Sequence, residues 1–198
     1  MINPEYFNIV LLGAPGSGKG TQARLLEQRY PLTHISTGAL YRKEIASGSP
    51  IGIKAKHLID RGNLCPDEMT LNLLYNYCAT LQDTRGFILD GVPRTLTQAK
   101  MMDGVGYQHI IPVTVAVYIK IEEQEIVARL LKRAVLENRT DDNLDVIRKR
   151  VEHYETLTKP LVAHYRAQKK LIKINGMQKE EQVFTDICKM LDAIVSFQ

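Results

Sequence analysis

The sequence predicts an α/β fold: a doubly wound parallel sheet of five strands with helices on both faces. Short apolar runs recur along the chain, and longer segments with helical periodicity separate them. A glycine-rich segment, GAPGSGKGT at 13–21, directly follows the first apolar run. Because strands alternate with helices, we expect right-handed crossovers and a ligand site at the carboxyl ends of the strands.

Five segments are the expected strands. Four are short apolar runs of the kind that forms buried parallel strands, at 7–12, 86–90, 113–119 and 170–174. The fifth, LTHIS at 32–36, is a weaker candidate that ends on polar residues, much as the run GFILD ends on Asp90. Polar residues at strand ends favour a ligand-binding edge.

The segments between these runs have helical periodicity, and the expected helices span 18–30, 66–81, 122–136, 142–168 and 180–197. Pro160 interrupts the fourth helix and should kink or split it near Lys159, because proline lacks the backbone N–H that an α-helix needs. Two segments fit the alternation poorly: the glycine-containing stretch 36–65 and the polar stretch 137–143. Both are expected to be excursions from the core.

The bulk composition predicts one soluble globular domain. Of the 198 residues, 44% are hydrophobic and 24% are charged, which excludes disordered and collagen-like chains. The net charge of +4 is too small for a protein that coats nucleic acid, so we expect no nucleic-acid partner. It suits a small anionic ligand, provided that the arginines converge on one cleft.

The cysteines and the N-terminal segment indicate the cellular compartment in which the protein is expected. Cys65, Cys78 and Cys188 lie far apart, with no CxxC pair or zinc-site spacing, which favours a reducing compartment. The N-terminal residues lack the features of a signal peptide, and no stretch of about 18 apolar residues could cross a bilayer. A cytoplasmic protein with no membrane partner is therefore expected.

The glycine-rich segment has the pattern of a phosphate-binding loop. Its glycines allow successive backbone N–H groups to point inward, and the helix that follows adds its positive end. Lys19 then places a flexible cation against the outer phosphates. In the general pattern the next residue carries a hydroxyl, but here it is Gly20, and Thr21 follows about 100° further around the helix.

Four blocks, GAPGSGKGTQ, ISTGALYRKEI, GFILDGVPRTLTQA and NRTDDN, resemble in their order and spacing the signatures of the adenylate kinase family. Gly20 followed by Thr21 is that family's own form of the loop. The resemblance implies a P-loop kinase domain over 1–198, with a monophosphate-binding arm at 36–65 and a short lid at 133–142. This lid is too short to hold zinc, so no structural zinc is expected.

The reaction that the resemblance implies is ATP + AMP = 2 ADP, with Mg²⁺ bound alongside ATP. Positioning and charge stabilisation dominate such a transfer, and arginine suits both tasks because its planar fork binds phosphate oxygens. Arg129 and Arg133 lie four residues apart and so share a helix face. The residues implied in catalysis are Lys19, Arg94, Arg129, Arg133, Arg139 and Arg150.

The resemblance also implies the nucleotide contacts. For ATP they are Gly16, Ser17, Gly18, Lys19, Gly20, Thr21, Arg129, Arg133, Gly176 and Met177, with Arg129 stacked on the adenine. For AMP they are Thr37, Arg42, Leu64, Cys65, Gly91, Arg94, Gln98, Arg139 and Arg150. Asp90 would hold magnesium through water, with Thr21 as a further candidate. Asp141 and Asp142 would pair with lid arginines, and Asp142 could also cap a helix.

The choice of acceptor depends on small polar contacts. Thr37 and Gln98 match the adenine-binding positions of the family, and an amide can both donate to and accept from the edge of adenine. The open alternatives are a UMP/CMP kinase and a nucleotide-binding protein with reduced turnover. Ala39 and Val92 depart from the family pattern beside the AMP site, while no histidine occupies a signature position. The resemblance implies a monomer.

Overall fold

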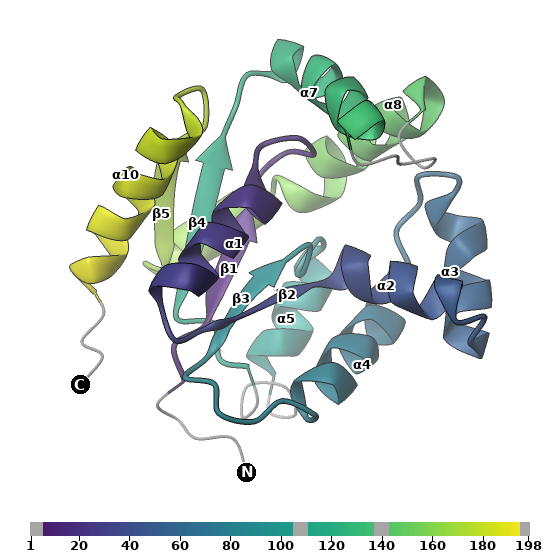
Figure 1. Ribbon diagram of the computed structural model, residues 1–198, viewed down its shortest axis with the longest axis horizontal. Helices are drawn as coiled ribbons and strands as arrows, with labels where there is room; N and C mark the ends of the chain where they lie inside the picture. The colour runs from purple at the N-terminus through teal and green to yellow at the C-terminus, as the bar shows by residue number, and fades with distance from the viewer. Residues whose placement is uncertain (1–5, 105–110, 137–142, 195–198) are drawn as a thin grey trace.

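The computed structural model describes residues 6–104, 111–136 and 143–194, and its centre is a five-stranded parallel sheet (Figure 1). The strands are β1 (Ile9–Leu12), β2 (Thr33–Ser36), β3 (Phe87–Asp90), β4 (Val115–Lys120) and β5 (Leu171–Asn175). Their order in the sheet is β2-β3-β1-β4-β5, so β1 lies in the middle. All five predicted strands are confirmed, including the weak candidate at 32–36.

Both faces of the sheet are buried, and β1 shows how its side chains divide between them. Ile9 and Leu11 pack on one face against α1 (Lys19–Arg29) and α10 (Glu180–Asp192). Val10 and Leu12 pack on the other face against α4 (Asp67–Cys78), α5 (Leu96–Asp103) and α9 (Leu161–Ala167). Alternate residues of a strand point to opposite faces, so a continuous apolar run is what a sheet covered on both sides requires.

The long helix expected at 142–168 is three separate pieces. They are α8 (Leu144–His153), a π-helical turn η1 (Tyr154–Thr158) and α9, which begins directly after Pro160. In the turn, Lys159 N donates to Tyr154 O at 2.8 Å, which is the wide i to i−5 spacing of a π-helix. The predicted break near Lys159 is therefore present, because Pro160 cannot continue an α-helical hydrogen-bond ladder.

The cap of α8 corrects one prediction. Asn143, rather than Asp142, is the N-cap: its backbone is extended, and its side-chain Oδ1 accepts from Val146 N at 3.0 Å. An amide oxygen caps the first turn as well as a carboxylate does. Asp142 itself, like Asp141, lies outside the described residues.

The segment 36–65 contains two short helices, α2 (Thr37–Ala46) and α3 (Pro50–Ile59), which project beside the sheet (Figure 1). Ser36 caps α2 and Ser49 caps α3, each by accepting from a backbone N–H three residues later. The segment has a small apolar cluster of its own, which includes Tyr41, Ala55 and Cys65. The remaining helix, α7 (Glu123–Leu136), leads into residues 137–142. Within the described ranges no helix combines the length and apolarity needed to span a membrane.

Two buried tyrosines allow a stability test of the core. The Tyr165 side chain is fully buried, and its hydroxyl has no hydrogen-bond partner within the described part of the chain. The buried Tyr154 hydroxyl instead pairs with the Tyr118 hydroxyl at 3.1 Å. Removing an unsatisfied buried hydroxyl relieves its desolvation cost, whereas removing a paired one leaves its partner unsatisfied.

We therefore expect Tyr165→Phe to raise the free energy of unfolding by about 1 kcal/mol and Tyr154→Phe to lower it by a similar amount. Urea unfolding of both variants and the parent measures this. Equal losses of stability in the two variants would contradict the difference between an unpaired Tyr165 hydroxyl and a paired Tyr154 hydroxyl.

Candidate active site at the carboxyl edge of the sheet

The loop between β1 and α1 presents free backbone donors at the edge of the sheet. Gly18 is the N-cap of α1, with a left-handed φ of 91°, and within the described part of the chain no side chain caps the helix at this end. A Cβ on Gly13 would lie 2.5 Å from Ser17 Oγ and 2.7 Å from Ile119 O, so the loop can pass this point only as glycine. The first N–H groups of α1 therefore remain available to an anion.

Lys19 folds back over this loop. Its Nζ donates to the carbonyl oxygens of Gly13 and Ala14, each at 2.9 Å. Burial lowers the pKa of Lys19 to about 8; the charge of Asp90 opposes this shift, and the charges of Arg94 and Arg133 add to it. The ammonium group is thus held in place at an electrostatic cost that a bound polyanion would relieve.

Asp90 ends β3 beside this loop, paired in register with Leu11 of β1. Burial by itself would raise the pKa of Asp90, but His34 and the charges of Lys19 and Arg94 outweigh it and hold the pKa below its ordinary value. His34 Nε2 lies 3.9 Å from Asp90 Oδ2. This histidine is absent from the site residues predicted from the sequence, although β2 ends beside β3 and the polar ending of LTHIS was a signal for it.

The position of Asp90 also explains the space left at Gly20. A Cβ on Gly20 would lie 3.4 Å from Asp90 Oδ2, so a side chain there would be directed against the carboxylate. Thr21, the next residue, lies about 100° further around α1. Glycine at 20 thus leaves the approach to Asp90 open, and the role of Thr21 toward magnesium stays a prediction.

Arg94 is held by the loop that follows β3. Its Nε donates to Gly91 O at 3.0 Å, and Thr37 Oγ1 donates to the same carbonyl at 3.0 Å. Burial lowers the pKa of Arg94, and Arg150 and Arg133 lower it further against the opposing charge of Asp90. Four cations therefore act on one another or on the same carboxylate: Lys19, Arg94, Arg133 and Arg150. This is the convergence on one cleft that a small anionic ligand requires.

Gln98 and Thr37, the expected adenine contacts, lie next to Arg94. Gln98 is 1% exposed, and its Oε1 already accepts from Arg94 N at 2.6 Å. The amide therefore has a structural task that the sequence did not reveal, since it orients the backbone of Arg94. Cys65 is buried near Arg94 and Tyr41, and burial raises the pKa of its thiol.

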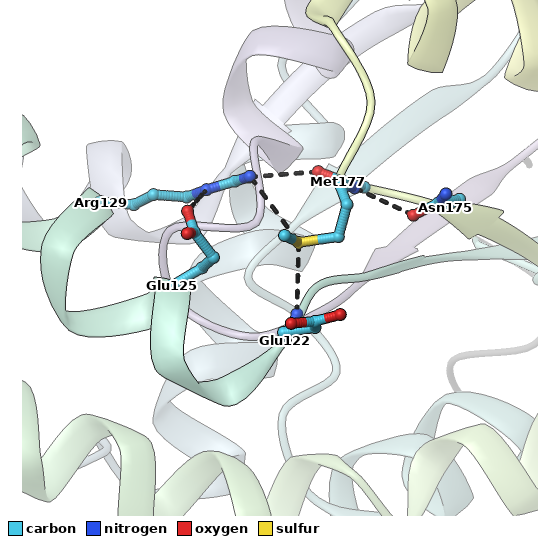
Figure 2. Close-up of polar contacts among 6 residues, drawn as sticks. Glu122, Glu125, Arg129, Asn175 and Met177 are labelled. Carbon is cyan, nitrogen blue, oxygen red and sulfur yellow. Dashed lines mark hydrogen bonds and ion pairs between the residues drawn. The ribbon is translucent and has the colours of Figure 1, made fainter.

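On the other side of the loop, Arg129 reaches from α7 to the segment after β5 (Figure 2). Its Nη1 donates to Gly176 O at 3.2 Å, its Nη2 contacts Met177 Sδ at 3.9 Å, and its Nε pairs with Glu125 at 3.3 Å. Met177 Sδ also accepts from Glu122 N at 3.5 Å. These contacts engage the nitrogen atoms at the edge of the guanidinium, which is the geometry that stacking on its face requires. The adenine contact itself stays a prediction.

Within the described ranges, the remaining predicted site residues lie on α2, in the phosphate loop and beside Cys65. Arg42 lies on α2 with its Nη1 3.4 Å from where a Cβ on Gly38 would lie, and Leu64 is half-buried next to Cys65. Gly16 lies under α7, because a Cβ there would be 3.3 Å from Arg129 Cβ. Ser17 is buried with an Oγ that has no partner among the described residues. Arg139 lies outside the described residues.

The pKa of Lys19 predicts a specific pH dependence of stability. The unfolded chain holds the Lys19 proton up to about pH 10.5, whereas the folded protein releases it near pH 8. The unfolded state therefore binds more protons between these values, so the Lys19 charge costs stability at neutral pH and this cost disappears as the pH rises. We expect ligand-free Lys19→Met to exceed the parent in unfolding free energy by about 1–2 kcal/mol at pH 7.

The difference should narrow toward pH 10, and urea unfolding at pH 7, 8, 9 and 10 measures it. Lys54→Met, at an exposed position, is the control and should show no such trend. A difference between Lys19→Met and the parent that does not change with pH would contradict the electrostatic cost assigned to Lys19.

Comparison with known proteins agrees with this geometry. The adenylate kinase family model matches residues 11–170. An adenylate kinase of Bacteroides fragilis and one of Bacteroides thetaiotaomicron are each 40% identical over 187 residues, covering 94% of this chain and 99% of the relative. An adenylate kinase of Xanthomonas campestris is 39% identical over 183 residues, covering 92% and 98%. The match spans the phosphate loop, the Asp90 strand and the arginine-bearing helices, and the chain belongs to the adenylate kinase family.

Proposed function

We propose that this enzyme transfers the terminal phosphoryl group of ATP reversibly to AMP. The observation that carries the proposal is the set of cations gathered at the carboxyl edge of the sheet, where burial and mutual repulsion lower the pKa of both Lys19 and Arg94. Two nucleotide phosphate chains would neutralise these charges. Fixed cations in a buried site stabilise the charge of the transferring group without the reorganisation that water would need.

ATP would bind on the loop side. Its phosphates would accept from the N–H groups at the start of α1 and from Lys19, whose ammonium already lies over the loop. Arg129 would stack on the adenine, since Gly176, Met177 and Glu125 fix its guanidinium by the edge. Arg133, further along α7, would reach the transferring phosphoryl group.

AMP would bind between the segment 36–65, which we propose is a mobile arm, and the loop after β3. Arg94 and Arg42 would hold its phosphate, with Arg150 approaching from α8 and Arg139 from a short lid at 133–142. Thr37 and Gln98 are buried beside Gly91 and Arg94, where a base could reach them. Closure of arm and lid would exclude water and so favour transfer over hydrolysis.

Asp90 fits a role in binding magnesium. Its carboxylate stays ionised at the end of β3 next to Lys19, and Gly20 leaves its approach open. One carboxylate suits Mg²⁺, which keeps several waters and is otherwise held by substrate phosphates. The ion would neutralise charge on the ATP phosphates. We further propose that the protein acts as a monomer in the cytoplasm, without a structural zinc ion.

An acceptor comparison tests the function directly. With MgATP as donor, we expect turnover with AMP to exceed turnover with CMP, UMP or GMP by at least about 100-fold in kcat/KM, because a buried amide facing the wrong base leaves polar groups unpaired. A coupled assay for nucleoside diphosphate measures it. Preference for CMP or UMP would favour the alternative of a UMP/CMP kinase, and ATP binding in calorimetry without turnover would favour a nucleotide-binding protein.

The role of Arg94 can be tested with its charge retained. Arg94→Lys keeps a cation but loses the planar fork that binds two phosphate oxygens, so we expect kcat/KM for AMP to fall about 100-fold. Arg24→Lys, at an exposed position on α1, is the matched control and should keep the parent's activity. A parent-like Arg94→Lys enzyme would exclude Arg94 as a phosphate ligand.

A further inference from the structure

The π-helical turn η1 makes a polar contact with the proposed acceptor site. Thr158, its last residue, donates from Oγ1 to the backbone carbonyl of Arg94 at 2.8 Å, across 64 residues of sequence. Thr158 lies outside the four signature blocks and is not among the site residues predicted from the sequence. The contact joins the helical layer behind the sheet to the loop that carries Arg94.

The hydroxyl of Thr158 bonds outside its own turn. A threonine in a helix usually donates to a carbonyl of the preceding turn, and Thr156 Oγ1, inside the same turn η1, does so to Glu152 O at 2.8 Å. Thr158 instead donates to another segment. It comes directly before Lys159 and Pro160, where the i to i−5 bond replaces the regular ladder.

The turn is also anchored to the sheet. Tyr154, its first residue, is buried, and its hydroxyl pairs with that of Tyr118 on β4 at 3.1 Å. The turn thus has one polar contact with the sheet and another with the loop after β3. Because the first residue of η1 is fixed to the sheet and its last residue is fixed to the Arg94 loop, η1 can hold the backbone of Arg94 at a defined place relative to the sheet.

Arg94 is held at three points as a result. Its N–H donates to Gln98 Oε1 at 2.6 Å, its carbonyl accepts from Thr158, and its Nε donates to Gly91 O at 3.0 Å. Two of these contacts fix the backbone and one fixes the side chain. Such restraint matters because Arg94 is a half-buried cation and Arg150, whose charge acts on it, lies on α8 one helical turn before η1.

We propose that Thr158 is a positioning residue for the acceptor phosphate: its hydrogen bond to Arg94 O keeps Arg94 facing Arg150, with the phosphate of the nucleoside monophosphate between them. This inference rests on the proposed function, in which both arginines bind that phosphate. The π-turn then serves as a spacer between the two cations. The phosphate would relieve the repulsion that the spacer maintains in the ligand-free protein.

Thr158→Val tests this role, because valine keeps the shape of threonine and removes the donor. The carbonyl of Arg94 would lose a partner, and we expect the KM for AMP to rise about five- to tenfold while the KM for ATP stays within twofold of the parent. Thr158→Ser keeps the hydroxyl and should restore the KM for AMP. Thr156→Val removes a hydroxyl of the same turn that bonds to Glu152 O of α8 and does not contact the Arg94 loop, so it should leave both KM values unchanged.

The variants also separate a positioning role from a purely structural one. If Thr158→Val lowers the melting temperature but leaves the KM for AMP unchanged, or raises the KM for AMP and ATP equally, the proposal is overturned. Calorimetric binding of AMP to the same variants should give dissociation constants that follow the KM values. Thr158→Ser with the same AMP defect as Thr158→Val would likewise overturn it, because the hydroxyl would then not be the acting group.

Arg94→Lys separates the positioning role of Thr158 from the proposed function, in which Arg94 binds the phosphate of AMP. If Arg94→Lys leaves the KM for AMP and kcat unchanged, the proposed function of Arg94 fails. If Arg94→Lys impairs AMP use but Thr158→Val does not, only the positioning role fails. In the double variant we expect Thr158→Val to add less than twofold to the KM for AMP, because the planar fork that Thr158 positions is already lost.

Discussion

The structure depends on one electrostatic constraint: positive side chains are held close together around the carboxylate of Asp90. Lys19 and Arg94 both have a lowered pKa, chiefly from burial, and each also experiences the charge of Arg133. The single carboxylate of Asp90 does not offset the repulsion among these cations, so the arrangement is unfavourable without a bound anion. It persists because the packing of the surrounding strands and helices keeps the side chains in place. The strands, caps and turns around the site keep these positive side chains in place against their mutual repulsion.

The parallel sheet supplies most of that support. β1 and β3 are neighbours in register, so the loop after β1 and the loop after β3 leave the sheet at the same edge. The first presents N–H groups and Lys19, and the second presents Asp90 and Arg94. Cations on α7 and α8 approach the same edge from helices that are far away in sequence, and η1 ties α8 to the Arg94 loop through Thr158. A ligand bound here would thus contact several parts of the chain at once.

Much of this was predictable from local sequence. The sequence placed all five strands to within two residues at their ends. The signal is continuous in β1, β3 and β4, because a strand buried on both faces is apolar along its length. The glycine spacing predicted the loop, and Pro160 predicted the break before α9. The shift of the α8 cap from Asp142 to Asn143 is an error of the usual kind, since adjacent Asp and Asn residues have equal capping preference.

The supporting contacts were not predictable in the same way. His34 beside Asp90, Gln98 on the Arg94 backbone and Thr158 on the Arg94 carbonyl all join residues that meet only after the sheet and helices have packed. No periodicity or spacing marks a side chain that bonds to a distant backbone group. The guanidinium of Arg129 on α7 is likewise fixed along its edge by Gly176 and Met177, which follow β5.

By itself, the sequence determined the fold class, the order of the elements and the residue types available for phosphate binding. These depend on hydrophobic periodicity and on local backbone freedom, which are properties of short segments. Only the tertiary structure decided which charges act on one another, which polar groups are already engaged and how Arg94 is held. Those outcomes depend on burial and on distances between segments, and a charge or a hydrogen bond acquires its strength only where packing has removed water.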